Sequence, residues 1–472
     1  KCTGHLQRPP SERRNMFSKK SFLAFFLILS FNSVVALGVD RTEGNGGQVK
    51  KDYFMAYTEF KKMIQWGLVS PSNFKGNLVN LIGQVWTKED QRAWIDALWD
   101  LIEEEGPQNK YIAFLEHPIP GVLPEMQLRY FYLMHKYVDQ SYLDNNYLYS
   151  LEVRLAKQKG KKTFDPIKST ISLEEIYLYY SLFENEKHPS IGNQYIKLMK
   201  IFPQVYSEFK FSTEKPSLSN EEVRAVFDFN PDLSTYHQGK YADAVRVYVF
   251  CSSNRDHPCR VLIKQADGEL HHHDNGSIWH GVALAASSKG LPPQQRDGQT
   301  PMGVQSMDSV MPEANFPESF GKYRRVILNW IPNHSNFHQR KLGKWQRPEP
   351  EMQQLLPLSA HASNWWRQAT LARDIGRVDL RIHGTGRPSV DSSLPWFPFR
   401  KTSGCIAQRE AVVDGETYHD QRVLLDDLMR AMSINVNYEN EIQIKGLLYL
   451  MEVQGEGPLS LEHLESVLGI RF

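Results

Sequence analysis

The stretch Arg381–Gln408, RIHGTGRPSVDSSLPWFPFRKTSGCIAQ, brings one histidine and one cysteine into a single segment of the chain. His383 lies directly before Gly384, and Cys405 lies directly after Gly404. A thiol and an imidazole held at tight backbone turns are the groups that a covalent cysteine mechanism requires. On these residues alone, a buried structural cysteine with an ordinary hydrogen-bonded histidine is the alternative.

Alternation in the residues around the start of this stretch predicts a β-strand that ends at His383. Polar and charged residues alternate there with aliphatic ones. Asp379, Arg381 and His383 would therefore share one face of the strand, while the aliphatic residues point into a core. Because Gly384 then turns the chain, His383 would lie at the strand end, where a catalytic base can meet solvent.

The loop of residues 385–402 is punctuated by glycine and proline and holds two adjacent aromatic residues, Trp396 and Phe397. It would either cover a cleft or pack as an ordinary inert loop. A turn at Gly404 then leads into Cys405. Successive backbone N–H groups at such a turn can converge on a developing oxyanion, and an adjacent imidazole would favour the thiolate.

The composition of the 472-residue chain is that of a globular protein, with 41% hydrophobic and 23% charged residues. Its length suggests about two to three domains. The formal net charge of +1 lacks the concentrated basic excess of a nucleic-acid-binding protein, so no nucleic-acid partner is expected.

An apolar run from Phe22 to Phe31 follows Lys19 and Lys20 and precedes small residues. This order is typical of a secretory signal, and the run is short for a membrane span. Residues 1–36 are therefore predicted to be a leader and signal peptide, which would make the protein exported. The alternatives are an uncleaved anchor, which would be the chain's one contact with a membrane, and a buried core helix.

The rest of the chain is predicted to be α+β and multidomain, with an all-helical N-terminal domain followed by a β-rich domain. Residues 37–50 would be a flexible mature N-terminus, 51–240 the helical domain, 241–455 the β-rich domain and 456–472 a C-terminal helix. Serine caps mark three of the predicted helices, at Ser172, Ser219 and Ser460. Aromatic residues of the helical domain would pack a core; the alternative is a surface that binds a glycan or a protein partner.

Four cysteines are present, and Cys2 lies in the predicted leader. Cys251 and Cys259 bracket a short polar loop, CSSNRDHPC, which a disulfide could close in an oxidising compartment. That pairing would leave Cys405 as a free thiol, and an unpaired cysteine in a secreted protein is a candidate reactive group.

A histidine-rich segment, HHHDNGSIWH at residues 271–280, lies in the predicted β-rich domain. Its spacing fits no established metal-binding pattern. It is interpreted as a solvated turn, with a metal site as the alternative.

Three motifs occur in order along the chain: TPMGV at residues 300–304, HG at 383–384 and TSGCI at 402–406. Together they closely resemble the L,D-transpeptidase (YkuD-type) family, over about residues 245–455. The resemblance implies a mixed, β-rich catalytic domain in which Cys405 attacks a peptide carbonyl and His383 activates the thiol.

The resemblance also implies how the site would be built. The carbonyl of Gly384 would orient the imidazole, and the oxyanion and binding positions would be Gly384, Thr402, Ser403 and Gly404. The backbone amides of Ser403, Gly404 and Cys405 would form the oxyanion hole. The substrate would be a peptidoglycan stem peptide in the periplasm or cell envelope of a bacterium, with an amine as acceptor and with no metal or cofactor.

Two positions depart from the family's motif. Many members have His where this chain has Ser403, and Asn or Arg where it has Ala407. These departures leave the nucleophile and the base but affect acceptor choice, so an L,D-carboxypeptidase or amidase that hydrolyses the acyl-enzyme is an alternative. A non-catalytic wall-binding scaffold that uses the helical domain is an alternative of another class.

Overall fold

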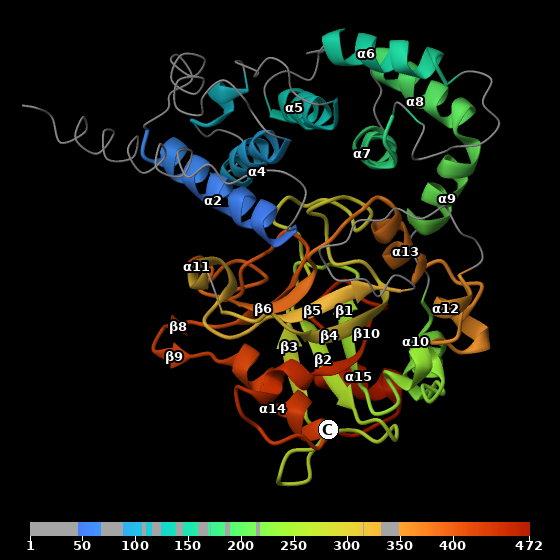
Figure 1. Cartoon of the computed structure of the whole chain (residues 1–472), viewed down its shortest axis with the longest axis vertical. Coiled ribbons are helices and arrows are strands. Elements are labelled where there is room, and N and C mark those ends of the chain that lie inside the picture. Colours follow the sequence, from blue (N-terminus) through green and yellow to red (C-terminus); the bar gives the residue numbers. More distant parts are fainter. Residues whose placement is uncertain are drawn as a thin grey trace, which may run out of the picture. The chain divides into compact units, whose positions relative to one another are not determined.

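The computed structural model describes most of the chain from residue 46 onward. The described residues are 46–67, 88–105, 110–115, 124–137, 145–158, 169, 171–184, 189–213, 218–314, 316–331 and 349–472. The predicted leader and signal, residues 1–36, lies outside them, as does most of segment 37–50. The chain divides into two compact units, Lys1–Leu123 and Pro124–Phe472. Helices precede a β-rich region with an eight-stranded mixed sheet (Figure 1), which confirms the predicted α+β, multidomain architecture.

Aromatic residues hold together the described part of the first unit. Its elements are α2 (Gly46–Gln65), α4 (Lys88–Glu105) and a 3₁₀ turn, η2 (Ile112–Phe114). The ring of Trp94 is fully buried and packs edge-on against Phe60 at 5.5 Å and against Phe114 at 6.1 Å. Such edge-to-face pairs stabilise a core beyond the area that they bury.

Five helices begin the second unit and share a core centred on α7. They are α5 (Pro124–Tyr137), α6 (Asn145–Ala156), α7 (Leu173–Phe183), α8 (Pro189–Ile201) and α9 (Pro203–Thr213). Most residues of α7 are buried. The predicted cap of α7 is confirmed, because the Ser172 side chain accepts a 3.0 Å hydrogen bond from the backbone N–H of Glu175. Leu371 and Ile375, from later in the chain, belong to the same core.

The β-rich region is built on one sheet whose strand order is β3-β2-β1-β10-β4-β5-β6-β7. The strands are β1 (Val245–Ser252), β2 (Cys259–Lys264), β3 (His280–Ala283), β4 (Gly303–Val310), β5 (Val326–Trp330), β6 (Arg381–Thr385), β7 (Ile406–Arg409) and β10 (Lys445–Val453). The pairs β1–β10 and β6–β7 are parallel, whereas the other neighbours are antiparallel. The sheet is therefore mixed.

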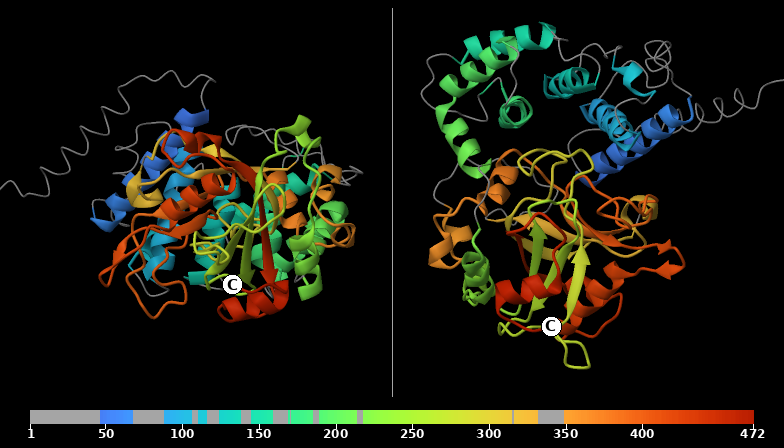
Figure 2. Two further views of the ribbon diagram at one scale, coloured as in Figure 1. Left: turned by 90° about the horizontal axis from the view of Figure 1, so that it is seen from below. Right: turned by 180° about the vertical axis from the view of Figure 1, so that it is seen from behind.

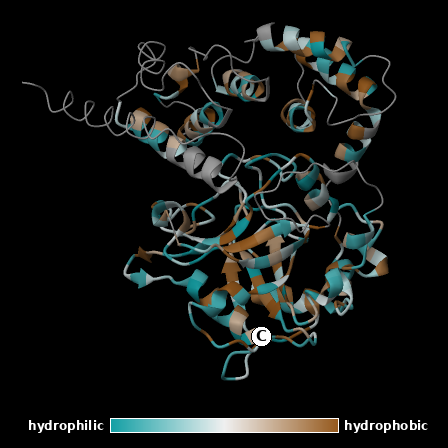
Figure 3. Cartoon of the chain, viewed as in Figure 1, coloured by the Kyte–Doolittle hydropathy of each residue, from teal (hydrophilic) through white to brown (hydrophobic). Residues whose placement is uncertain are grey.

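The two end strands, β3 and β7, meet at one point. Leu284 and Ala407 exchange two backbone hydrogen bonds there, of 2.9 and 2.8 Å. The sheet is therefore nearly closed. The central strands β1 and β10 are buried along almost their whole length, and Figure 3 shows hydrophobic residues concentrated on the strands. This apolar interior is the main core of the second unit.

Short helices and turns flank the sheet, as Figure 2 shows from two further directions. The α-helices are α10 (Asn220–Asp228), α11 (Pro317–Phe320), α12 (Pro350–Gln353), α13 (Arg367–Asp374), α14 (Asp420–Ala431) and α15 (Leu461–Leu468). The 3₁₀ turns are η3 (Tyr236–Gly239), η4 (Leu358–Ala360) and η5 (Asn440–Gln443), and a small hairpin pairs β8 (Val412–Val413) with β9 (Glu416–Thr417). The predicted caps Ser219 and Ser460 are confirmed, each accepting a 3.1 Å backbone hydrogen bond. Within the described residues, no helix is both long and apolar enough to span a membrane.

Candidate active site

Strands β6 and β7 bring His383 and Cys405 to the same face of the sheet. In their parallel register, Ile382 lies opposite Ile406 and His383 lies opposite Ala407. Cys405 comes two residues before Ala407 and therefore shares its face, since alternate residues of a strand point the same way. The two isoleucines point into the main core. His383 and Cys405 thus lie on the opposite face, in diagonal positions of the parallel register.

The imidazole of His383 is fixed in one orientation. Its Nδ1 lies 2.5 Å from the backbone carbonyl oxygen of Gly384, which is the contact that the resemblance implies. Because a carbonyl oxygen can only accept, Nδ1 carries the proton and Nε2 is left as the basic nitrogen. Burial lowers the pKa of His383 to about 3, and the positive charges of Arg325 and Arg381 act in the same direction. The imidazole is therefore neutral at neutral pH.

The prediction that the strand ends at His383 and leaves the base open to solvent is wrong, because β6 continues to Thr385 and His383 is 2% exposed. Phe320, the last residue of α11, covers this imidazole. The two rings meet edge-on, with centroids 5.0 Å apart and an angle of 81° between planes. The guanidinium of Arg325 lies over the Phe320 ring at 4.5 Å, and that of Arg381 at 5.8 Å. One aromatic ring thus excludes water from His383 and holds two cations beside it, through the attraction between a cation and a π face.

The thiol of Cys405 is only 9% exposed and donates a 3.5 Å hydrogen bond to the backbone carbonyl of Asp379. Burial raises its pKa, while the nearby positive charges of Arg381, Arg377 and Arg325 act in the opposite direction. A raised thiol pKa and a lowered imidazole pKa make the resting pair neutral. The cations around the sulfur would then stabilise a thiolate as it forms.

Asp379 lies outside the strand in which it was predicted. Strand β6 begins at Arg381, and Asp379 has a left-handed φ of 72°. The prediction that Asp379 continues the alternation of Arg381 and His383 is therefore wrong. Aspartate is among the non-glycine residues that adopt this conformation most readily, and the resulting turn places its carbonyl beside the thiol of Cys405.

Arg377 lies directly behind the turn that carries the nucleophile. A Cβ atom added to Gly404 would lie 2.2 Å from the Arg377 Nη2 atom, and Gly404 has a φ of 100°, so only glycine fits there. The Arg377 guanidinium donates 2.9 Å hydrogen bonds to the backbone carbonyls of Gly298 and Gln299, and another to that of Pro293. Its burial lowers its pKa to about 10, which leaves it charged at neutral pH.

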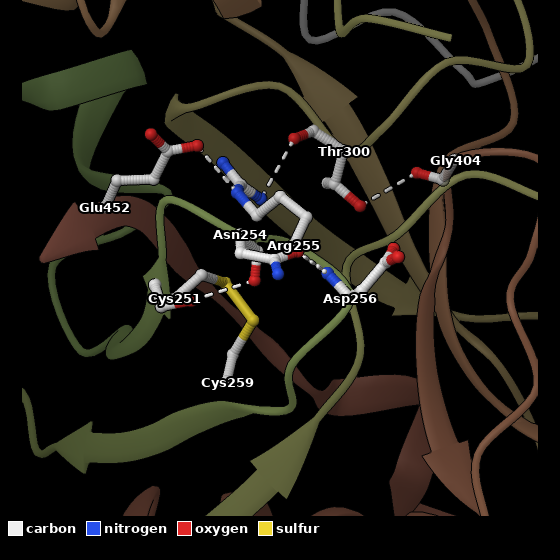
Figure 4. The surroundings of a disulfide bond; sticks show 9 residues. Cys251, Asn254, Arg255, Asp256, Cys259, Thr300, Gly404 and Glu452 are labelled. Carbon is white, nitrogen blue, oxygen red and sulfur yellow. Dashed lines mark hydrogen bonds and ion pairs between the residues drawn. A yellow bond between two sulfur atoms is a disulfide. The ribbon is translucent and has the colours of Figure 1, made fainter. Parts of the chain in front are cut away.

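A hydrogen bond joins the first sequence motif to the third at this turn. The Thr300 hydroxyl of TPMGV donates to the carbonyl of Gly404 at 3.0 Å (Figure 4). The Thr402 hydroxyl donates to the carbonyl of Cys405 at 2.7 Å. Ser403 is exposed, so the turn reaches the surface there while Gly404 and Cys405 are buried.

The predicted disulfide between Cys251 and Cys259 is confirmed. The loop that it closes carries Arg255, whose Nε atom lies 2.7 Å from a carboxylate oxygen of Glu452 in β10. The same guanidinium donates a 3.5 Å hydrogen bond to the backbone carbonyl of Thr300 (Figure 4). Since Thr300 binds the nucleophile turn, the disulfide loop supports that turn through one intermediate residue.

The loop between β6 and β7 packs over the outer face of β7. Trp396 is partly buried and packs against a small apolar cluster of Leu284, Ala286, Phe399 and Ala407. The ammonium group of Lys401 lies 3.6 Å from the centre of the Trp396 ring. Ala407, one of the two departures from the family's motif, is therefore fully buried and offers no polar group.

Sequence reasoning missed Phe320, Arg325 and Arg377, all of which surround the predicted pair. Arg325 is the residue directly before β5. Val326 pairs with Ile382 in the antiparallel register of β5 and β6, so the same register, continued by one residue, places Arg325 opposite His383. Alternation in YRRVILNW gives the side of the strand on which Arg325 lies. No pattern in the sequence gives the strand order that brings it to the thiol.

The histidine-rich segment at residues 271–280 lies apart from these groups. His271 lies within hydrogen-bonding distance of the Asp427 carboxylate, at 3.1 Å. Among the residues that the structure describes, no group of three or more His, Cys, Asp or Glu side chains is arranged to hold a metal ion.

Comparisons of this chain with protein-family models, with curated proteins and with solved structures found no match.

Proposed function

We propose that this protein is an exported cysteine acyltransferase of the L,D-transpeptidase type, acting on peptidoglycan stem peptides in the periplasm or envelope of a bacterium. One observation carries the proposal. A neutral imidazole, oriented by the carbonyl of Gly384, lies on the same sheet face as a free thiol at a glycine turn. The hydrogen bond from Thr300 of the first motif to Gly404 of the third also supports the proposal, because it joins two of the motifs at that turn.

The chemistry would use the basic Nε2 atom of His383. As Sγ of Cys405 bonds to the carbonyl carbon of the third-position diamino acid, Nε2 takes the thiol proton. The backbone amides of Ser403, Gly404 and Cys405 would stabilise the oxyanion. When the C–N bond breaks, His383 gives its proton to the leaving nitrogen, D-alanine departs and a thioester remains.

An amine of a neighbouring stem would resolve the thioester. It would lose a proton to Nε2 of His383 and form a new amide bond, while the released sulfur takes the proton back. No metal or cofactor takes part. The arginines around Cys405 contribute by stabilising negative charge on the sulfur in both half-reactions, inside a site from which water is largely excluded.

Hydrolysis of the same thioester is a second candidate activity, and Ala407 favours it. That position is buried beneath Trp396 and carries no polar group. An acceptor amine would therefore find no hydrogen-bonding side chain there. Water needs no such recognition, and an L,D-carboxypeptidase or amidase would result.

Export is supported by the Cys251–Cys259 disulfide, because disulfides persist in oxidising compartments. The partner of the helical region, whether a glycan or a protein, is part of the same proposal. Its aromatic side chains in the described helices of the second unit are largely buried in a core, which favours a structural use of those rings.

The test compares the full chain with its Cys405→Ala variant on purified disaccharide-tetrapeptides, with products identified by mass spectrometry. Cross-linked dimers that require Cys405 would support transpeptidation. Tripeptide monomers that require Cys405 would support hydrolysis. If neither product depended on Cys405, the enzymatic proposal would fail, and retention of the protein on insoluble peptidoglycan would then favour a wall-binding scaffold.

A further inference from the structure

We propose that Arg377 is a positioning residue for Cys405, and that helices α5 and α7 hold it in place through the loop of residues 293–299. This gives the helices of the second unit a role in the chemistry. It rests on the proposed function only in taking Cys405 as the nucleophile. Arg377 acts through the backbone of Gly404 and through its charge beside the thiol.

Helix α5 reaches the loop through Arg129, a side chain that is 1% exposed. Its guanidinium lies 3.6 Å from the carboxylate of Asp297 and donates a 3.3 Å hydrogen bond to the backbone carbonyl of Arg296. One buried cation therefore binds two adjacent loop residues. Since a buried charge is tolerated when it is paired and hydrogen-bonded, these contacts fix the loop backbone against α5.

Helix α7 holds the side chains of the same loop. Nη2 of Arg296 donates a 3.0 Å hydrogen bond to one carboxylate oxygen of Glu174, and its Nε lies 2.9 Å from the other oxygen. The side-chain amide of Gln295 donates a 2.9 Å hydrogen bond to the hydroxyl of Ser181. One charged and one neutral side chain of the loop are thus hydrogen-bonded to α7, which restricts the direction in which the loop presents its carbonyls.

Those carbonyls are the partners of Arg377. Its guanidinium binds the backbone oxygens of Pro293, Gly298 and Gln299. On its other side it lies against Gly404, where an added Cβ would meet the Gly298 carbonyl oxygen at 2.4 Å as well as Arg377. The loop, Arg377 and the nucleophile turn are therefore packed without space between them. A displaced loop would displace Gly404 and, with it, Cys405.

The segment that carries Arg377 is seated on the same helices. Helix α13 ends at Asp374, and Leu371 and Ile375 pack in the core of α5 to α9. Arg367, at the start of α13, pairs with Glu208 of α9 at 3.7 Å. Figure 1 shows α13 beside α9. The guanidinium and the carbonyls that it binds are thus both held by one helical layer.

Several charged or titratable groups lie around the thiol. The positive charges of Arg381, Arg377 and Arg325 favour its thiolate. Asp379 binds the thiol through its backbone carbonyl, while His383 lies on the same face of β6 and Asp297 lies beyond Arg377. Arg377 differs from the others in that its side chain touches the turn that carries the sulfur. Replacing it should therefore change both the charge at Cys405 and the position of Cys405.

The experiment measures the rate at which iodoacetamide alkylates Cys405 from about pH 5 to about pH 10, a range that brackets ordinary thiol titration. Peptide mass spectrometry assigns the labelled cysteine. The full chain is compared with Arg377→Met, Arg377→Lys, Arg129→Met and Arg154→Met. Melting temperatures show that each variant folds, and kcat and KM for tetrapeptide donor are measured in parallel.

Arg154→Met is the matched control for Arg129→Met. Arg154 of α6 is also a largely buried arginine of the helical region, and it binds both carboxylate oxygens of Glu175 in α7 at 2.6 and 2.7 Å. Both of these contacts are with α7, and neither involves a residue of the 293–299 loop. Its loss should lower the melting temperature and leave the alkylation midpoint and kcat within about twofold of the parent, as for distant sites that share no partner.

Arg377→Met should move the alkylation midpoint to higher pH by about one unit, because a cation beside the thiolate is removed. It should also lower kcat about 100-fold with little change in KM, because the nucleophile is misplaced. Arg377→Lys keeps the positive charge, so the alkylation midpoint should stay near that of the parent. A lysine lacks the planar guanidinium that binds three carbonyls at once, so kcat should remain low. Arg129→Met should lower kcat about tenfold.

The proposal is overturned if Arg377→Met melts earlier but keeps both its alkylation midpoint and its kcat, because Arg377 would then be structural only. Equal losses of kcat in Arg129→Met and Arg154→Met would overturn the part played by α5, since general destabilisation would explain both. If the parent chain turned over no donor at all, the proposed function would fail while the alkylation midpoints would still decide the role of Arg377.

Discussion

The two faces of strands β6 and β7 have different surroundings, one apolar and the other polar and charged. On one face, Ile382 and Ile406 are each 1% exposed and belong to a large apolar core. On the other, His383 and Cys405 are also buried but lie among guanidinium groups, backbone carbonyls and the ring of Phe320. Alternation along two short strands is enough to separate them.

The difference teaches that burial serves two purposes in the same strands. Burial of the isoleucines stabilises the fold through the removal of apolar area from water. Burial of His383 and Cys405 costs stability in their charged forms and keeps both groups neutral, which suits a base that must accept a proton from a thiol. Mutations on the face of His383 and Cys405 should therefore lower mainly activity, and mutations on the isoleucine face should lower mainly stability.

The largest expected effect comes from His383 on the polar face. His383→Gln keeps a side chain of similar length and polarity but removes the basic nitrogen. We expect kcat for Cys405-dependent product to fall about 10²- to 10⁴-fold, the usual contribution of a general base. Quenched assays with tetrapeptide donor measure it. An unchanged kcat in a folded variant would show that another group takes the thiol proton.

The disulfide loop contributes to both the apolar core and the polar site. Cys251 and Cys259 lie in the main core, while Arg255 donates a hydrogen bond to the carbonyl of Thr300. Replacing both cysteines by alanine should lower the free energy of unfolding by about 2–3 kcal/mol, the value for a short closed loop. Denaturant unfolding measures this loss. Arg255→Met, with the disulfide intact, should lower kcat while costing less stability than the double variant; the reverse ranking would count against support of the turn by Arg255.

Of the two faces, only the polar one carries groups that contribute to the pH dependence of stability. Below the ordinary His pKa of 6.5, the unfolded chain binds a proton that buried His383 takes up only near pH 3, so stability from this group falls as pH falls through that window. The slope is at most about 1.4 kcal/mol per pH unit. The raised pKa of Cys405 acts at the other end, because the unfolded thiol ionises first and stability falls as pH rises above about 8.5.

Denaturant unfolding at a series of pH values measures the loss of stability at acid pH (the acid limb) and at alkaline pH (the alkaline limb). His383→Gln should make the acid limb shallower and leave the alkaline one, whereas Cys405→Ala should do the converse. An acid limb of the same slope in His383→Gln would assign the proton uptake to other groups.

Sequence reasoning located the groups whose signals are local. His383, Cys405 and Thr300 stand in short motifs, the disulfide closes a nine-residue segment, CSSNRDHPC, and three helices begin at serine caps that bind their own first turns. Each of these depends on residues close together in the chain. The α+β, multidomain architecture followed from the change of residue pattern near Tyr241.

The remaining parts of the site depend on contacts between distant segments. Arg377 and Gly298 are 79 residues apart, and Arg129 and Arg296 are 167 apart. No local pattern records such a pairing, because it follows from the strand order and from the packing of helices. The misplacement of Asp379 has a different cause: alternation describes extended backbone, and a left-handed φ interrupts it without a change in residue pattern.

The smallest expected effect tests the apolar face, with Ile406→Val beside the nucleophile. Removing one methylene from this fully buried side chain should lower the free energy of unfolding by about 1 kcal/mol. Because Ile406 points away from the thiol, the alkylation midpoint of Cys405 and kcat per folded molecule should stay unchanged. A shifted midpoint would mean that the core sets the position of the nucleophile, and the separation between the two faces would then be incomplete. With an unshifted midpoint, residues adjacent in sequence would act independently because they face opposite sides of one strand.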